Sequence, residues 1–280
     1  MGTAASGRPA SETVIAREVV AAIGAHAGAV TPGVIRLETS VGGLLTGLGR
    51  SARYRIAGIT PAPVTGASAT VSSGQASLQI EIAVAADRPA AETAAAVQRS
   101  VARAVTAGTG LRVTGVRVVI LDIVLDRRKA GRRPPERPAE WASWADGGAW
   151  REELAAADRA SGAGGSAGTS GGPGDSRAEV CAAVLRAVRS VPGLQPASPV
   201  RPERARWMPW DPAGLAVGLD DGGLEVQLAA SRLPLPPLLD QAAAAIRQAT
   251  ARTAWGARPH RLVIAALDAG ALAVPVAANP

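Results

Sequence analysis

The sequence has few of the residues on which most catalytic and cofactor sites depend. Its 280 residues include no Phe, one Tyr, one Cys and two His. The single cysteine, Cys181, cannot form an intrachain disulfide, and with only His26 and His260 beside it no zinc quartet can be assembled. The scarcity of aromatics leaves cores of small aliphatic side chains and little surface to line a cofactor pocket. We therefore expect no metal, no cofactor and no enzymatic activity.

Long apolar runs and a strongly basic domain are also missing. No stretch of about 18 apolar residues occurs and the N-terminus lacks a signal-peptide pattern, so we expect neither standard export nor a membrane span. The net charge of +7 is spread along the chain, with +4 on residues 1–125, zero on 126–176 and +3 on 177–280. Nucleic-acid binding is therefore the weaker interpretation. Arg supplies 29 of the 30 basic residues, which together with abundant Ala, Gly and Pro suggests a GC-rich bacterial genome.

The first 125 residues have the periodicities of a small α/β domain. From Ser11, apolar residues at helical spacing (Ile15, Val19, Ile23) predict an amphipathic helix. Strict alternation from Leu78 to Val84 predicts a half-buried strand, with Val71 and the Ser72–Gln75 turn offering a hairpin partner. A second helix begins at Pro89, with Ala94, Val97, Val101 and Val105 as its buried stripe, and ends at Gly108 to Gly110. The closing strand, which holds Val116, Val118 and Ile120, is apolar on both faces, so we expect it to be central.

A diverged copy of this plan follows at residues 177–268. Leu78–Ile82 matches Leu224–Leu228, and Leu121-Asp122 matches Leu267-Asp268, both at an offset of 146 residues. The Pro32-Gly33 turn matches Pro192-Gly193 at an offset of 160, so the second copy lacks 14 residues, largely the first copy's Gly-rich loop. We predict an α+β protein of two small α/β domains related by internal duplication, each a mixed three- to four-stranded sheet packed by two helices. Two copies of this size indicate two domains rather than a solenoid.

The segment between the copies, residues 126–176, is the candidate interaction region. It is Gly/Ser-rich near its end and has one dense basic run, followed by an acidic stretch; the run comprises Arg127, Arg128, Lys129, Arg132, Arg133 and Arg137. A solvated, self-attracting linker explains this run, and contact with an anionic membrane surface or with nucleic acid is the alternative. Four apolar side chains of the linker can share one helical face: Trp141, Trp144, Trp150 and Leu154. They either dock within the chain or form a partner contact.

Two short patterns resemble catalytic motifs but lack their context. Gly164 to Gly168 spells the Gly-x-Ser-x-Gly nucleophile pattern within the Gly/Ser-rich linker, where no strand-to-helix turn is expected. Gly47 to Ala52 meets a loose dinucleotide-binding pattern, yet no clear strand precedes it and no helical pattern follows. Neither supports an enzymatic function.

After its opening helix, the first copy has five motifs in a fixed order: Val30-x-Pro32-Gly33-Val34, Gly43 to Arg50, Leu78 to Val84, Val97-Gln98-x-x-Val101 and Thr109 to Val118. In this order it resembles the alkaline-shock, or general-stress, envelope stress response proteins of Gram-positive bacteria. The resemblance implies a cytoplasmic, non-catalytic scaffold at the inner face of the membrane. It also implies recruitment by small membrane-anchor proteins and self-association. Nucleic-acid binding through the linker arginines is the alternative function.

The predicted organisation is then a disordered N-terminus at 1–10, the alkaline-shock-like domain at 11–125, the linker at 126–176, the second copy at 177–270 and a tail at 271–280.

Overall fold

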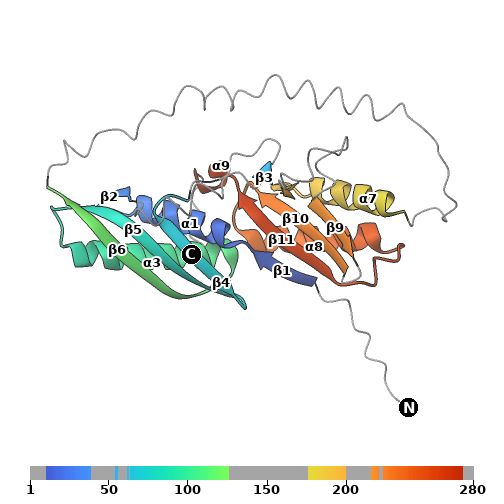
Figure 1. Cartoon of the computed structure of the whole chain (residues 1–280), viewed down its shortest axis with the longest axis horizontal. Coiled ribbons are helices and arrows are strands. Elements are labelled where there is room, and N and C mark those ends of the chain that lie inside the picture. The colour runs from blue at the N-terminus through green and yellow to red at the C-terminus, as the bar shows by residue number, and fades with distance from the viewer. Residues whose placement is uncertain are drawn as a thin grey trace, which may run out of the picture. The chain divides into compact units, whose positions relative to one another are not determined.

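The computed structural model describes residues 11–38, 54–55, 62, 64–125, 176–199, 216–220 and 223–273. All of them belong to one compact unit. The fold is α+β, with two mixed sheets and helices packed on them (Figure 1). A short antiparallel pair, β3 (Tyr54–Arg55) with β8 (Ser198–Pro199), is separate from both sheets.

The first sheet is built around β5. It consists of β2 (Val34–Leu37), β4 (Ala67–Ser72), β5 (Gln75–Ala85) and β6 (Arg112–Val124). β4 and β2 run antiparallel to the first and last parts of β5, and β6 runs parallel to it on the other side. The β4–β5 hairpin turns at Ser73 and Gly74, both with positive φ (49° and 73°). This is the pattern of a two-residue hairpin turn, and the predicted hairpin is confirmed.

Two helices, α1 (Arg17–Ala29) and α3 (Ala90–Thr109), pack on one face of this sheet (Figure 1). Val97, Val101 and Val105 follow one another at helical spacing on α3 and are fully buried. They meet the inward residues of β5, which alternate along the strand as predicted: Leu78, Ile80, Ile82 and Val84. α3 follows Pro89, and Gly110, in the left-handed conformation at φ 74°, caps its end.

The second sheet repeats this connectivity around β10. Its elements in chain order are α7 (Arg177–Arg189), β7 (Leu194–Pro196), β9 (Val217–Asp220), β10 (Gly223–Ala230), α8 (Leu235–Thr250), β11 (His260–Leu267) and the short α9 (Ala269–Ala273). β9 and β7 are antiparallel to successive parts of β10, and β11 is parallel to it. β9 and β10 form an antiparallel hairpin, and prolines stand in the first turn of α8.

The two sheets can be aligned residue by residue through their strand pairing. β2 meets β5 at Val34 and Val84, and β7 meets β10 at Leu194 and Ala230, which keeps the predicted offsets of 160 and 146. Both central strands have a register shift at the same place, after Ile82 and after Leu228. The predicted match of Leu121-Asp122 with Leu267-Asp268 is wrong by two residues. Ile123 pairs with Val84 and Leu267 with Ala230, so the last strands correspond at an offset of 144.

The start of the first predicted helix is also corrected. Ser11–Ile15 forms a strand, β1, which pairs in parallel with β11 and makes the second sheet five-stranded. Thr13, Val14 and Ile15 are consecutive β-branched residues, which favour strand over helix. Helix α1 begins only after Ala16, whose backbone is extended and whose amide donates to the Ile264 carbonyl at 2.9 Å.

The predicted central position of β6 is wrong, because β5 is the central strand. Within the described residues β6 pairs with β5 alone and lies at the edge of the sheet. Its inward residues, which include Val116, Val118 and Ile120, pack against the core as partly buried side chains. Near its end, Leu121 and Ile123 remain about half exposed (47% and 53%). β6 is therefore apolar on both faces because it carries exposed aliphatic side chains, and not because it lies between two other strands.

Candidate partner-binding surface

All of the predicted interaction residues lie outside the residues that the structure describes. This holds for the apolar group (Trp141, Trp144, Trp150 and Leu154) and for the basic run (Arg127, Arg128, Lys129, Arg132, Arg133 and Arg137). The Gly-rich loop at 43–50 lies outside them as well. These assignments stay predictions, and the candidate surface described below comes from the first sheet.

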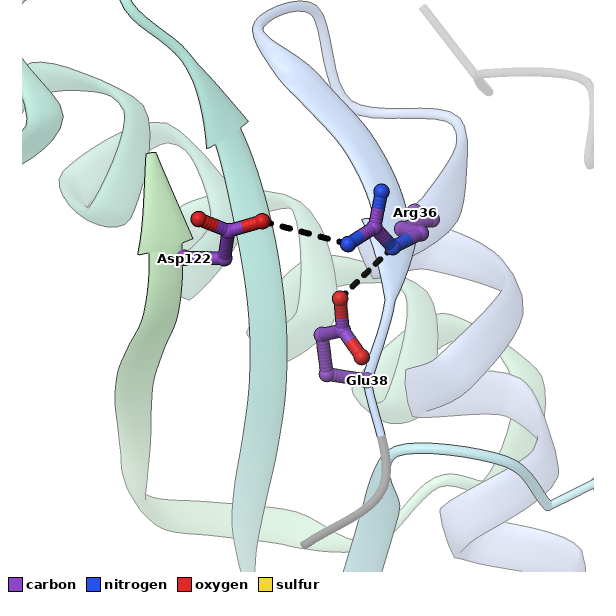
Figure 2. Close-up of polar contacts among 3 residues, drawn as sticks. All are labelled: Arg36, Glu38 and Asp122. Carbon is purple, nitrogen blue, oxygen red and sulfur yellow. Dashed lines mark hydrogen bonds and ion pairs between the residues drawn. The ribbon is translucent and has the colours of Figure 1, made fainter. Parts of the chain in front are cut away.

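The face of the first sheet opposite its helices is polar and open. Arg36 on β2 donates to the carboxylates of Glu38 (Nε to Oε1, 2.6 Å) and of Asp122 on β6 (Nη2 to Oδ2, 3.1 Å). Figure 2 shows the arginine reaching across β5 to Asp122, with the helices behind the sheet. Arg36 and Asp122 are each about half exposed. Screening by water keeps such pairs weak, so their effect is mainly to orient side chains on this face.

A shallow, solvent-open hollow of about 510 Å³ lies further along the same sheet. It crosses β4, β5 and β6 and is lined by Ser68, Ala69, Thr70, Ser77, Leu78, Gln79, Gly115, Val116 and Arg117. Most of the lining residues are small or polar, and Arg117 is the single ionisable residue among them. Arg117 has no ion-pair partner among the described residues. A hollow this open to solvent does not enclose a small substrate in the way that ligand pockets do.

The outer edge of β6 adjoins this face. No described residue pairs with that edge, so a row of backbone amide and carbonyl groups is left without strand partners in the described structure. The apolar side chains Leu121, Ile123 and Leu125 are exposed at the end of the strand, at 47%, 53% and 88%. An open edge beside exposed aliphatic side chains is a typical site for an added strand.

The cysteine, Cys181, and the buried histidine, His260, both lie in the second half. Burial raises the pKa of the Cys181 thiol, while Arg177 acts in the opposite direction. Burial lowers the pKa of His260, against the raising effect of the Trp255 carbonyl near its Nε2 at 3.3 Å; Arg247 lowers it further. The ring packs at the start of β11, where it is 2% exposed. In the described part of the chain no carboxylate or nucleophile is seen bonded to His260, and no group of three potential ligands could hold a metal.

Sequence reasoning did not identify this surface. Arg36, Arg117 and Asp122 are separated in sequence and belong to no motif, and only the strand register brings them to one face. Leu121 and Ile123 are exposed, although they belong to the strand that the sequence predicts to be central. Their one sequence signal is the change of alternation at Leu121, which the structure shows as a bulge after Ile120.

Helices that could cross a membrane were sought among the described residues, and none is both long and apolar enough.

Comparison with known proteins supports the resemblance drawn from the first-half motifs. No curated protein and no solved structure matches the chain. A family model does match, over residues 7–125, and its description is the alkaline shock protein 23 family, with a cell envelope-related function. The matched segment ends with β6 and includes α1, the first sheet and α3 as well as β1. Residues 7–125 of the chain therefore match the alkaline shock protein family, and the match does not extend to the second half.

Proposed function

We propose that this chain is a non-enzymatic scaffold in cell-envelope homeostasis, which acts by binding other proteins at the cytoplasmic face of the membrane. The observation that carries the proposal is the family match over residues 7–125, with its envelope-related function. The open edge of β6 and its exposed aliphatic side chains support a role in protein association.

We further infer that the second half is a diverged copy of the first. The repeated connectivity, the constant offsets within each strand and the bulge at the same position support a common origin. In this account the copies have divided their roles, because only the second sheet receives an added strand among the described residues. The outer edge of β6 in the first sheet then stays available for a partner.

The linker contributes membrane or partner contact in this proposal. The basic run from Arg127 to Arg137 attracts an anionic surface, and Trp141, Trp144 and Trp150 provide apolar anchors beside it. Replacing the six basic residues by Gln and, separately, the three Trp by Ala distinguishes the two contributions. We expect the Gln variant to lose salt-sensitive membrane association and the Ala variant to lose a protein partner.

The test of function is complementation. Cells that lack the chain are challenged with an agent that damages the envelope, and survival is restored by the wild-type gene. Because the proposal includes no catalysis, Cys181→Ser and His260→Asn variants that fold should restore survival as well as the wild type. Loss of complementation by either variant at wild-type protein levels would point to chemistry at that residue. Unchanged survival of cells that lack the chain would contradict the envelope role.

A further inference from the structure

The strongest clue to the occupant of the open β6 edge is the closed edge of its counterpart. β11 occupies in the second sheet the place that β6 occupies in the first, each parallel to its central strand. The outer edge of β11 pairs with β1 over five residues, from Ser11 opposite His260 to Ile15 opposite Ile264. At the offset of 144, these β11 positions correspond to Val116 through Ile120 on β6.

Equivalent residues differ in burial. Leu121 is 47% exposed, and the residue at its position in the second sheet, Ala265, is 4% exposed. Ile123 is 53% exposed, and its counterpart Leu267 is 2% exposed. Leu121 and Ile123 thus lie in the open in the first sheet, whereas their counterparts Ala265 and Leu267, which follow the β11 residues paired with β1, are covered in the second. Covering Leu121 and Ile123 would remove apolar surface from water, which stabilises a complex.

The charged residues at the two edges also indicate that a strand can be added to β6. On the second sheet, Arg261 bonds to Glu225 on β10 (Nη1 to Oε2, 3.0 Å) and lies 3.5 Å from the Glu12 carboxylate on the added strand (Nε to Oε2). Arg117 stands at the position of Arg261, opposite Gln79 rather than a glutamate. It has no acidic partner in the described part of the chain. An incoming strand with an acidic residue at the place of Glu12 would complete the same pair.

The chain cannot provide that strand in the way it provides β1. β1 directly precedes α1, so the equivalent donor would directly precede α7, at residues 171–175. These residues are three glycines, a proline and an aspartate, and Gly and Pro are depleted from strands because they weaken or interrupt the ladder. β1 itself is already paired with β11. Neither β1 nor its sequence counterpart is thus suited to cover β6, and we infer that the occupant comes from another molecule.

We propose that the outer edge of β6 binds an extended segment of a partner protein, which adds as a parallel strand with an acidic residue facing Arg117. The segment carries β-branched aliphatic residues two and three positions after the acid, as Val14 and Ile15 follow Glu12. Its backbone bonds to the edge, and aliphatic residues further along cover Leu121 and Ile123. This inference deepens the proposed function and rests on it, since it gives the chemistry of the partner.

The test uses the full chain and a labelled peptide of residues 8–18 of this sequence, which contains the β1 pattern. Binding is measured by fluorescence anisotropy for the wild type and for two charge-reversal variants, Arg117→Glu and the matched control Arg261→Glu. We expect Arg117→Glu to weaken binding tenfold or more and Arg261→Glu to leave it within about twofold. The same peptide with Lys in place of Glu12 should bind the Arg117→Glu variant more tightly than it binds the wild type.

Several results would overturn the proposal. Absence of saturable binding up to millimolar peptide would do so, as would equal binding to wild type and Arg117→Glu. Loss of binding in Arg261→Glu instead would mean that the peptide displaces β1 from β11. Amide chemical shifts locate the site independently and should change along 116–123 and not along 260–267. Concentration-dependent self-association that is lost in Arg117→Glu would assign the edge to a second copy and refute a separate partner.

Failure of this test and failure of the proposed function can be told apart. The peptide experiment requires no membrane and no stress, whereas complementation depends on both and measures no strand addition. Arg117 has no described ion-pair partner, so Arg117→Glu should unfold within about 1 °C of the wild type, which excludes misfolding as the cause of lost binding.

Discussion

Replacing Ile15 by Ala tests whether β1 holds the second sheet closed. Ile15 is 5% exposed and belongs to the hydrophobic core, although it precedes the first helix. Replacing an Ile buried to this extent by Ala lowers the free energy of unfolding by about 2–5 kcal/mol. Ile15 ends a five-residue edge strand, where the neighbours can relax, so we expect the lower part of that range, about 2–3 kcal/mol.

Hydrogen exchange locates the loss of stability caused by Ile15→Ala. A change of about 2–3 kcal/mol in opening free energy corresponds to roughly 30- to 150-fold faster exchange of the amides that the β1–β11 pairing protects. The bond from the Ala16 amide to the Ile264 carbonyl should be the most sensitive probe. Val14→Ala, at a half-buried position on the same strand, is the matched control and should give a smaller change.

The alternative is a first helix that starts near Ser11 and leaves β11 uncovered. In that case Ile15→Ala would accelerate exchange in α1 and leave β11 unchanged. Such a result would refute the pairing of β1 with the second sheet and, with it, the comparison from which the β6 site was inferred.

Three further predictions concern single residues. Burial lowers the pKa of His260, so its contribution to stability is complete above its ordinary pKa of about 6.5 and falls as the pH drops toward the folded-state value. The free energy of unfolding in urea should therefore be lower at pH 5.5 than at pH 7.5 in the wild type, and this difference should be smaller in His260→Asn. An equal difference in both proteins would refute this role. Gly33 has φ +97° and an added Cβ would lie 2.8 Å from the Thr93 hydroxyl, so Gly33→Ala should cost about 1–3 kcal/mol in urea unfolding, and no measurable cost would contradict that backbone geometry. Asp122→Asn removes a half-exposed ion pair and should change stability by less than about 1 kcal/mol, whereas a larger loss would mean that the pair with Arg36 is better shielded than its exposure indicates.

Local patterns predicted the elements that bury one regular face. The four-residue spacing of Val97, Val101 and Val105 and the alternation from Leu78 to Ile82 each match one period, and the structure places these residues in the core. Turn chemistry was equally informative at Ser73-Gly74, where positive φ is required. These signals are short-range, so one sequence was sufficient to detect them.

Long-range pairing could not be predicted in the same way. Ile15 lies four residues before Val19, which suits a helix, and its strand partner Ile264 is far along the chain. Likewise, the apolar pattern of β6 does not show whether a second strand lies beside it. The candidate surface could not be predicted for the same reason, because Arg36, Arg117 and Asp122 share a face only through the register of three strands.

The central claim is that the chain acts at the envelope through protein association, and cell fractionation tests it most directly. Native cells are separated into membrane and soluble fractions, with and without nuclease, at low and high salt. The account predicts recovery with the membrane that nuclease does not change, and partial release by salt would identify the linker arginines as contributors. A wholly soluble chain whose apparent size shifts on nuclease treatment would contradict the account and favour nucleic-acid binding.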